Sequence, residues 1–397
     1  MRVGIVGCGN ICGIYIKNNK LFKDIEITAC ADINAAAAES CASSFGLQAR
    51  SVDALIGSSD VDIVLNLTVP AVHAQVSRAA IEAGKHVFSE KPLATSLADG
   101  VALVERGKAK GLRVGCAPDT ILGAGLQTAK SILDSGQIGP VITGLAAVMS
   151  RGMEHWHPNP GFFYQKGAGP VLDLGPYYIS ALAALLGPVT SVRATGQISP
   201  LPRRYGVDGP RKGEIFPVDT FTTINSVLTF ANGANISFIA SWDVWRHGVR
   251  PIELHGTLAS LRVPDPDTFG GRVEVSGGDL PPNMHDAEEA AKVGQRPEWA
   301  ITETTHKQFG AINYPFDHPT IANYRSIGLA EMANAIVEGR PHRCNGDFAL
   351  HVLATMLGIL DAASTGQPVH IVQSCEKPAA LTDVDATRLL RPEAEVV

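Results

Sequence analysis

A lysine and a glutamate stand together where an apolar run of the sequence ends. The stretch "KHVFSEKPLA" begins at Lys85, and Glu90, Lys91 and Pro92 directly follow its apolar part. A proline after the lysine restricts the Lys91 backbone to extended conformations and fixes the direction of its side chain. We therefore expect an ammonium that points into an active site, although a surface ion pair between Glu90 and Lys91 is the default interpretation of such residues.

A glycine-rich turn near the start of the chain offers a site for a phosphate. In "RVGIVGCGNICG", Gly7 and Gly9 stand between a predicted strand and a predicted helix, and Asn10 and Ile11 continue the turn. Such a turn lets a pyrophosphate approach the backbone N–H groups at the start of the helix. Cys12 replaces the third glycine of the usual dinucleotide pattern. A turn of this kind can also be purely structural.

Asp32 strengthens the nucleotide interpretation. It ends the second predicted strand and lies 23 residues after Gly9, close to the ~20 residues expected for the acid that binds the adenosine ribose hydroxyls. Its carboxylate would repel a 2′-phosphate, and the next basic residue is Arg50, so NAD is favoured over NADP. Two alternatives stay open, because Asp32 could cap the following helix and methyltransferases also combine a glycine turn with an acid.

Two further stretches bring side chains to the same edge of the predicted sheet. The predicted strand over 61–68 leads into "LTVPAVH", which places Thr68, Pro70 and His73 at the carboxyl edge, where ligands of open α/β sheets bind. The predicted strand over 86–88 brings Glu90 and Lys91 to that edge. We therefore expect Lys91 to lie beside the nicotinamide end of the cofactor, with Glu90 as the buried partner that orients it.

Short β-rich runs alternate with alanine-rich helical patterns in the first part of the chain. The predicted strands cover residues 2–6, 25–31, 61–68, 86–88 and 112–116. Alternation of strands and helices is typical of the α/β class with a doubly wound parallel sheet. Residues 1–122 are therefore the predicted NAD-binding Rossmann domain.

Residues 123–397 are predicted to form an α+β domain that binds the substrate and makes the oligomer contacts. After a helix at 125–133, strands build an open, mostly antiparallel sheet with helices on one face, and Asn232-Gly233 marks a hairpin. The predicted strands cover 141–149, 219–230, 235–244, 251–263 and 272–275, and later helices cover 324–338 and 347–363. The polar segment 276–323 is expected to be a lid, a subunit contact or a mobile loop. The last 20 or so residues are expected to be loosely attached.

Length and composition exclude several classes of protein. A chain of 397 residues exceeds the roughly 250–300 that one core serves, so two domains are expected. A net charge of −6 without a long basic run argues against nucleic-acid binding. We expect no membrane span, because the longest apolar stretch, 179–186, is far below the ~18–20 residues required. The seven cysteines form no CxxC pair, which favours reduced thiols and a cytoplasmic location.

Taken in order, the motifs resemble one enzyme family. "GCGNI", Asp32, "TVPAVH", "GKHVFSEKPLA", "GAGPVLDLGPYY" and "GRPHR" are similar to the glucose-fructose oxidoreductase and inositol dehydrogenase family (Gfo/Idh/MocA) over nearly the whole chain. The resemblance implies an NAD(P)-dependent enzyme that acts on sugars, inositols and related polyols. It also implies a Rossmann domain followed by a sheet that often forms dimers or tetramers, so a homodimer or homotetramer is expected.

The same resemblance points to a second catalytic motif, formed by Asp173, Gly175 and Tyr177. Pro176 would break a helix interior, so we expect a helix to begin near Asp173 as its N-cap. Residues i and i+4 share one helix face, and Asp173 and Tyr177 can then meet the same substrate. Many relatives have histidine in place of Tyr177 and aspartate in place of Ser180, so the general base must be argued from this chain.

Tyr177 and Lys91 compete for the role of general base. A free tyrosine titrates near ~10, but a neighbouring ammonium favours the phenolate, so we expect Lys91 to lower the pKa of Tyr177. Tyr177 would then remove the hydroxyl proton while hydride leaves the same carbon for C4 of the nicotinamide, and Asp173 would orient the sugar and the lysine. In the rival hypothesis Lys91 itself is the base and Tyr177 only packs.

Three basic residues are further candidates for substrate contacts. Arg151 and His157 lie in "SRGMEHWHPNP", and Arg325 is expected at the start of a helix, facing the sugar. The spacing of His155 and His157 can hold a metal, but no acid or cysteine cluster completes a site, so no metal is predicted. Asp119 stands where relatives often have arginine, which puts a family contact at that position in doubt.

The sequence thus predicts an NAD-dependent dehydrogenase that oxidises a hydroxyl of a cyclic sugar, glycoside or inositol by direct hydride transfer without a metal. One alternative is a reductase that works on a keto sugar in the opposite direction. Another is an NAD-binding regulatory protein without turnover. The joint presence of Lys91, Asp173 and Tyr177 argues against the regulator, because a pure binding module needs none of them.

Overall fold

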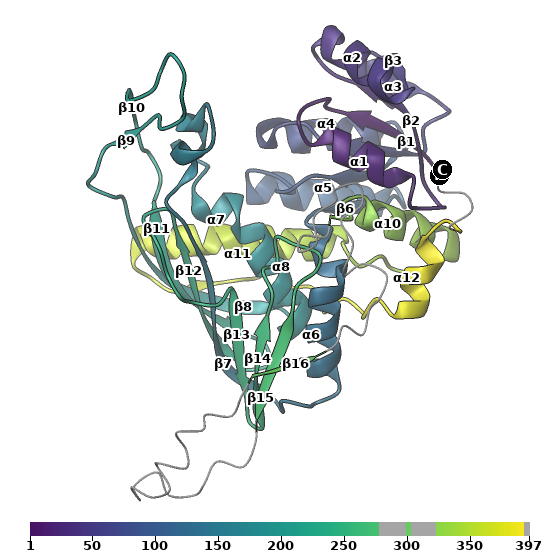
Figure 1. Ribbon diagram of the computed structural model, residues 1–397. Helices are drawn as coiled ribbons and strands as arrows, with labels where there is room; N and C mark the ends of the chain where they lie inside the picture. Colours follow the sequence, from purple (N-terminus) through teal and green to yellow (C-terminus); the bar gives the residue numbers. More distant parts are fainter. Residues whose placement is uncertain (278–298, 303–322, 393–397) are drawn as a thin grey trace, which may run out of the picture.

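Two sheets organise the computed structural model, which describes residues 1–277, 299–302 and 323–392. The purple and blue N-terminal part carries a parallel sheet, and the teal and green part carries a larger, mostly antiparallel sheet (Figure 1). The predicted fold class, a Rossmann doubly wound sheet followed by an α+β domain, is confirmed. The predicted boundary at residue 122 falls between a short 3₁₀ helix, η2 (Asp119–Leu122), and the helix that follows it.

Six parallel strands form the first sheet in the order β3-β2-β1-β4-β5-β6. The chain winds in one direction from β1 to β3 and in the other from β4 to β6, so the order reverses between β1 and β4. In such a sheet the ligand cleft opens at the carboxyl ends of these two central strands. The strands are β1 (Arg2–Val6), β2 (Glu26–Ala31), β3 (Gln48–Arg50), β4 (Ile63–Asn66), β5 (His86–Ser89) and β6 (Val114–Cys116).

Helices connect these strands, as the alternating pattern predicts. They are α1 (Cys12–Asn19), α2 (Ala35–Phe45), α3 (Val52–Gly57), α4 (His73–Glu82) and α5 (Leu97–Ala109), with the 3₁₀ helix η1 (Pro70–Val72) before α4. The short elements β3 and α3 were not predicted. The fourth strand is shorter than its predicted span of 61–68, because the Asn66 side chain accepts the Thr68 N–H at 3.2 Å and turns the chain out of the sheet.

Nine strands form the second sheet, in the order β16-β15-β14-β13-β7-β12-β11-β8-β17. Only β12 and β7 run parallel among the described pairs; the others are antiparallel. Its strands are β7 (Val141–Met149), β8 (Val189–Gln197), β11 (Thr223–Phe230), β12 (Asn235–Ser241), β13 (Ile252–Gly256), β14 (Ala259–Val263), β15 (Val273–Gly277), β16 (Ala300–Thr302) and β17 (Val369–His370). A separate pair, β9 (Arg203–Arg204) and β10 (Ile215–Phe216), belongs to an outlying lobe (Figure 1).

Helices cover one face of this sheet. The long helices after residue 123 are α6 (Ala124–Asp134), α8 (Gly175–Leu186), α10 (Ile327–Glu338) and α11 (Gly346–Thr365), and the short ones are α7 (Pro170–Asp173), α12 (Asp383–Leu389), η3 (Met153–His155) and η4 (Pro160–Tyr164). Of these, α10 packs against β6 of the first sheet and against α12. Every residue of α8 is buried, and α6, α8 and α11 pack against strands of the sheet. Along β11 buried residues alternate with more exposed ones, as expected for a sheet covered on one side.

The helix α11, predicted over 347–363, is longer than the apolar stretch 179–186 on which the expectation of no membrane span was based. It has 20 residues and a mean hydropathy of 1.5 in its most apolar window, enough to cross a membrane by length and composition. Within the described residues it is the one helix that meets both criteria. However, 67% of that window is buried inside the protein, where α11 contacts β8, α8 and α5. This packing is that of a core helix.

Two predicted elements differ in detail. The predicted strand at 251–263 is a hairpin of β13 and β14. Its turn at Thr257 and Leu258 lacks the Asn-Gly pair that marks such a hairpin in a sequence. The Asn232-Gly233 hairpin is confirmed between β11 and β12, where Gly233 has φ of 91°. In the segment 276–323, β16 adds an edge strand beside β15, and the rest of this proposed lid, subunit contact or mobile loop lies outside the described residues.

The expectation of a loosely attached C-terminus is wrong for the described residues. Arg343 donates hydrogen bonds to the carbonyl oxygens of Ala379 and Ala380 at 3.0 and 2.8 Å and to Asp385 at 3.0 Å. Glu331, which is fully buried, accepts from Arg343 at 2.7 Å and holds that guanidinium in place. These bonds fasten α12 against α10, and the sequence gives no local sign of them because the partners are far apart in the chain.

Replacing Glu331 with glutamine should destabilise the protein strongly. The substitution removes the fully buried counter-charge of Arg343 and leaves only Asp385, at 3.0 Å, to balance its guanidinium; breaking a buried ion pair costs roughly 3–5 kcal/mol in comparable cases. We expect a clear fall of the urea midpoint. The control Glu82→Gln removes an acid that is 46% exposed and paired with Arg106, and it should leave the midpoint nearly unchanged. Equal shifts in the two variants would contradict the role given to Glu331.

Candidate active site

The turn after β1 has the geometry that a pyrophosphate requires. Gly7 has φ of 105°, and a Cβ there would lie 2.6 Å from the carbonyl carbon and oxygen of Leu67, so only glycine fits. A Cβ at Gly9 would meet nothing within 4 Å, which leaves open space outside the turn. Asn10 is exposed and Ile11 is half-buried directly before α1. The backbone N–H groups at the start of α1 are therefore accessible to an anion.

Asp32 lies beside this turn. Its carboxylate oxygens accept the N–H groups of Cys8 and Asn34, each at 2.8 Å. The N-cap of α2 is Asn34, whose side chain accepts from Ala36 N–H at 3.1 Å, so the alternative that Asp32 caps this helix is wrong. A hollow of about 470 Å³ opens next to Asp32.

The surroundings of Asp32 fit NAD. Ile33 is fully exposed and Val69 is 64% exposed, so two apolar side chains stand at the carboxyl edge where an adenine could pack. Arg50, which lines the hollow, is paired with Asp60 at 2.6 Å. Its charge is therefore already balanced, and the carboxylate of Asp32 dominates the ribose end of the site.

His73 has a different role from the predicted cofactor contact. Its side chain is buried, and its two ring nitrogens lie 2.7 Å from Pro92 O and 2.8 Å from Thr68 O. Thr68 and Pro70 stay at the edge of the sheet, half-buried and exposed respectively. Because both ring nitrogens are engaged, His73 ties the loop after β4 to the loop after β5 and so positions Lys91.

Lys91 reaches across to the second domain. Its Nζ donates to the backbone oxygen of Asp173 at 2.7 Å and lies 3.2 Å from Asp173 Oδ1. Glu90, the expected partner of this ammonium, instead accepts from Tyr15 Oη at 2.8 Å and from the Lys91 backbone N–H at 3.0 Å. Glu90 therefore fixes the backbone and Asp173 holds the charge. Tyr15, on α1, was not singled out in the sequence.

Asp173 is not the N-cap that the sequence predicted. Pro170 begins a short helix, α7, that ends at Asp173, and Leu174 is the N-cap of α8. Pro176 still lies in the first turn of α8, as expected. The predicted meeting of Asp173 and Tyr177 occurs through Lys91, whose Nζ lies 5.1 Å from the centroid of the Tyr177 ring.

Burial reverses the expected protonation of Tyr177. Burial raises the pKa of Tyr177 to about 12, although the charge of Lys91 acts to lower it. Burial also opposes the charge of Lys91, but Tyr177, Asp173 and Glu90 outweigh it and raise the pKa of Lys91. Both groups therefore carry their protons at neutral pH. The sequence predicted correctly that the charge of Lys91 lowers the pKa of Tyr177. It did not predict that burial raises this pKa by more than Lys91 lowers it.

Arg325 and Asp267 complete the site. Arg325 lies before α10 rather than on it, because Ser326 has φ of 91° and the helix begins at Ile327. The Arg325 guanidinium donates to Tyr177 Oη at 3.5 Å and lies 3.9 Å from Asp267 Oδ1. Burial in the cleft raises the pKa of Asp267 to about 6, while Arg325 lowers it.

Sequence reasoning missed Asp267 altogether. The side chain is 43% exposed at the mouth of the site, on the loop between β14 and β15. The stretch "VPDPDTFGG" gave a weak signal, since acids in a proline- and glycine-rich connection between strands are candidates for function. Asp119, in contrast, is buried and accepts the Gly328 N–H at 3.0 Å, so it supports the start of α10 instead of facing a substrate.

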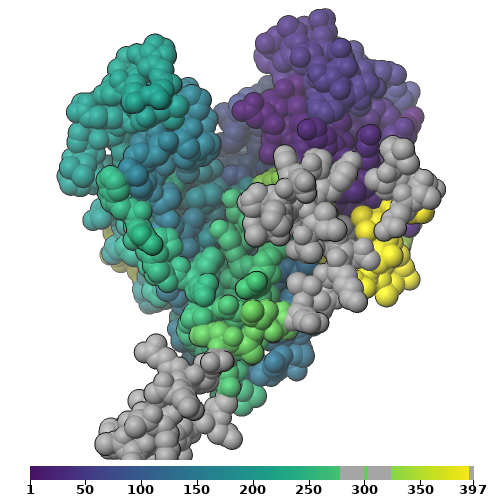
Figure 2. Space-filling view, viewed as in Figure 1, coloured from purple at the N-terminus to yellow at the C-terminus, as the bar shows by residue number. Residues whose placement is uncertain are grey.

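Arg151 and His157 lie apart from this cluster. The Arg151 guanidinium stacks on Trp245 at 3.8 Å from the ring centroid, and His157 Nδ1 accepts the Asn159 N–H at 3.0 Å. No described contact joins either residue to Lys91 or Tyr177. Figure 2 shows an open notch between the teal lobe that carries β9 and β10 and the purple Rossmann domain.

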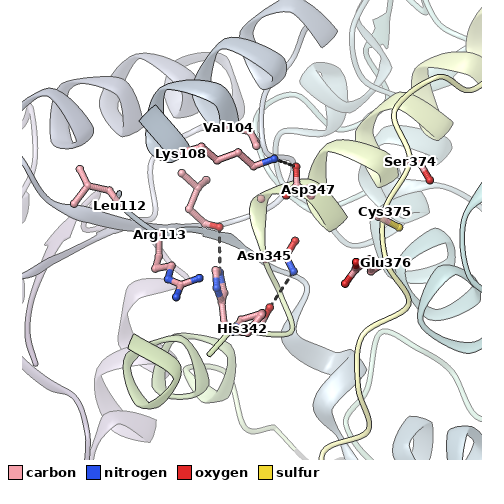
Figure 3. A pocket seen from close by; sticks show the side chains of 13 residues that line it. Val104, Lys108, Leu112, Arg113, His342, Asn345, Asp347, Ser374, Cys375 and Glu376 are labelled. Atoms are coloured by element: carbon pink, nitrogen blue, oxygen red, sulfur yellow. Dashed lines mark hydrogen bonds and ion pairs between the residues drawn. The ribbon is translucent and has the colours of Figure 1, made fainter. Parts of the chain in front are cut away.

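A second hollow, of about 580 Å³, lies at the opposite, amino end of β6 (Figure 3). An ion pair of 2.6 Å between Lys108 and Asp347 crosses its wall, and His342 Nε2 donates to Val114 O at 3.1 Å. None of its lining residues is among the predicted site residues. The Lys91 edge, where the titratable groups converge, is therefore the candidate active site.

The parallel sheet carries a glycine turn and an acid that is placed to bind a ribose, and it is followed by an α+β domain. This combination defines a dinucleotide-binding protein of the Rossmann class. Two family models match the chain: "Oxidoreductase family, NAD-binding Rossmann fold" over residues 1–117, and the GFO/IDH/MocA C-terminal domain over residues 126–262. The chain belongs to the Gfo/Idh/MocA oxidoreductase family, and the resemblance found in the sequence is confirmed.

Characterised relatives match parts of the chain. Inositol 2-dehydrogenase 3 from Saccharopolyspora erythraea is 40% identical over 142 residues, which are 35% of this chain and 42% of that protein. Levoglucosan dehydrogenase from Pseudarthrobacter phenanthrenivorans is 27% identical over 253 residues, 58% of this chain and 63% of that protein. The chain therefore spans less than two thirds of the length of either relative.

The fold is shared over a longer stretch than the sequence. The solved structure of a levoglucosan dehydrogenase in complex with NADH and L-sorbose matches with a TM-score of 0.75 at 22% identity. The match covers 94% of this chain and 99% of that one. At this identity the likeness establishes the fold.

Asp32→Ala should weaken NAD binding. Hydrogen bonds to a charged group contribute ~1.5–3 kcal/mol, so we expect the Kd for NAD to rise about 10- to 100-fold and the preference over NADP to shrink. Isothermal titration of both cofactors measures this. Glu26→Ala, at the opposite end of β2, is the matched control and should bind NAD normally. An unchanged Kd in Asp32→Ala would remove the ribose role of Asp32.

Proposed function

We propose that the chain is an NAD-dependent dehydrogenase that oxidises a hydroxyl of a cyclic sugar, glycoside or inositol. One observation carries the proposal: Lys91 from the Rossmann sheet contacts Asp173 at 2.7 and 3.2 Å and lies over the ring of Tyr177. An ammonium, an acid and a phenol that converge from two domains at the ligand edge of a nucleotide-binding sheet are the groups expected around a reacting hydroxyl. The inositol and levoglucosan relatives support a polyol substrate.

The residues of the Rossmann edge would hold the cofactor. Gly7 and Gly9 would admit the pyrophosphate, Asp32 would bind the ribose, and Ile33 and Val69 would flank the adenine. When bound, NAD supplies a nicotinamide ring that accepts a hydride. The carboxylate of Asp32 makes NAD a better fit than NADP.

The substrate proton would leave through Tyr177. As the substrate O–H bond breaks, its proton moves to Tyr177 Oη, and the proton of Tyr177 passes to the carboxylate of Asp267. This relay is needed because Tyr177, with its pKa raised to about 12, cannot wait as a phenolate at neutral pH. Lys91 and Arg325 stabilise the negative charge that develops on the two oxygens. Asp173 keeps Lys91 in place.

The remaining expectations belong to this proposal. Residues 1–122 would act as the cofactor domain, and residues 123–397 would bind the substrate and form a homodimer or homotetramer. Arg151 and His157 would reach the outer hydroxyls of a substrate from across the notch. A cytoplasmic location is supported by the seven cysteines, all of which are free thiols.

Reduction of a keto sugar is the second candidate. Because Lys91 and Tyr177 both hold protons at neutral pH, they are ready to donate one to a carbonyl oxygen as it becomes a hydroxyl. Assays in both directions decide between the candidates. NADH formation with a panel of sugars, glycosides and inositols supports the dehydrogenase, and tight NAD binding without turnover in either direction would favour a regulatory protein.

Tyr177→Phe should lose most of its turnover. The loss of one acid–base group slows catalysis by about 10²- to 10⁴-fold. Tyr178→Phe is a matched control, because the neighbouring hydroxyl faces Asp265 at 3.3 Å instead of Lys91. Steady-state kcat of both variants tests the assignment. A Tyr177→Phe enzyme that keeps most of its kcat would transfer the role of base to Lys91.

The pH profile should report Asp267. Below about pH 6 its carboxyl is protonated and cannot accept a proton, so kcat/KM for oxidation should rise as the pH increases through about 6 and then level off. In Asp267→Asn the rise of kcat/KM near pH 6 should disappear, and the plateau value of kcat/KM should be lower. If the same rise of kcat/KM near pH 6 persists in Asp267→Asn, it reports the titration of another group, and Asp267 is not part of the proton relay.

A further inference from the structure

Four thiols gather beneath the dinucleotide turn. Cys8 lies in the turn, Cys12 begins α1, Cys30 lies in β2 and Cys41 in α2. The sulfur atoms of Cys8, Cys30 and Cys41 all lie within 4.8 Å of one another, and Cys12 Sγ lies 3.9 Å from Cys41 Sγ. Within the described residues, no other group of three or more histidine, cysteine or acidic side chains comes this close.

These distances approach those of a tetrahedral thiolate site. Zinc binds cysteine sulfur at about 2.3 Å, which places the sulfurs of a tetrahedral site about 3.8 Å apart. The Cys12 to Cys41 distance already matches this value. The sulfurs of Cys8, Cys30 and Cys41 need to approach one another by about 1 Å or less to reach this spacing. Cys12 lies beside Cys41 but outside this group of three, so its side chain would have to turn toward Cys8 and Cys30.

The packing of the thiols alone does not account for the cluster. Cys12, Cys30 and Cys41 belong to the hydrophobic core, where thiols behave as small apolar groups. Their only described polar contacts are weak ones, such as Cys8 Sγ to Ala31 O at 3.6 Å and Cys30 Sγ to Ala38 O at 3.5 Å. The sulfurs nevertheless face one another instead of being dispersed among aliphatic side chains.

A disulfide would join only two of these sulfurs, whereas one thiophilic cation can contact all of them. Such a cation displaces the thiol protons as it binds.

We propose that Cys8, Cys30 and Cys41, with Cys12 as the fourth ligand, form a binding site for a thiophilic divalent cation such as Zn²⁺. The ion would join the turn, β2 and α2, the three segments that carry Gly7 and Asp32. Because the Cys8 N–H donates to Asp32 at 2.8 Å, the same ion would hold the ribose acid in place. Its role is structural, and no step of the hydride transfer passes through it.

This proposal departs from the sequence, which predicted no metal. That prediction considered ligands close in the sequence, such as His155 and His157, and found no cluster to complete a site. The four cysteines come together only when α1, β2 and α2 pack.

Cadmium titration of the reduced, metal-free chain tests the site. Cd²⁺ bound by thiolates gives a charge-transfer band in the ultraviolet, and we expect one Cd²⁺ per chain, displaced by Zn²⁺. Cys41→Ser should weaken binding by more than about tenfold, because Cys41 is close to all three other thiols. Cys375→Ser, which replaces a half-buried thiol outside the cluster, should bind Cd²⁺ like the unmodified chain.

Alkylation of the unmodified chain keeps the test valid if Cys41→Ser does not fold. Cys8 is partly exposed, so iodoacetamide should label it slowly without metal and much more slowly with Zn²⁺, while labelling of Cys375 stays the same. Mass spectrometry of peptides measures both sites. Absence of the charge-transfer band, an identical band in Cys41→Ser, or labelling of Cys8 that Zn²⁺ does not change would overturn the proposal.

Discussion

The contact between the Lys91 ammonium and Asp173 is the interaction on which the site depends. It joins the carboxyl edge of the parallel sheet to the last residue of α7, directly before α8, and it brings Tyr177 under the same positive charge. An ammonium that is only 19% exposed must have compensating charges nearby, because burial without them would be too costly. The two domains therefore meet here around one charged group.

Several further contacts hold the Lys91 ammonium in one place. His73 ties the Lys91 loop to the loop after β4, and Glu90 holds the Lys91 backbone while Tyr15 holds Glu90. Such support matters because a catalytic group displaced by 1 Å loses much of its effect. The glycine turn and Lys91 are linked through Tyr15 on α1 and Glu90, so in the proposed mechanism cofactor binding and proton transfer would share one framework.

Local sequence patterns were enough to predict the nucleotide-binding part of the candidate site. The glycine turn, Asp32 and Lys91 follow from strand ends that a sequence displays directly. The protonation of Tyr177 could not be predicted, because burial outweighs the nearby charge and depends on the packed fold. Asp267, the structural role of His73 and the cysteine cluster were missed for the same reason, since each depends on segments that are distant in the chain. The attached C-terminus depends on Arg343 and Glu331 in the same way.

A crystal structure of the chain with NAD and a polyol chosen by thermal-shift screening tests the central claim most directly. The account predicts that one hydroxyl of the polyol lies about 3 Å from both Tyr177 Oη and Lys91 Nζ, with its carbon facing the nicotinamide. A polyol whose hydroxyls reach neither atom, or a Lys91 that turns away from Asp173 and Tyr177 when the site is filled, would contradict it.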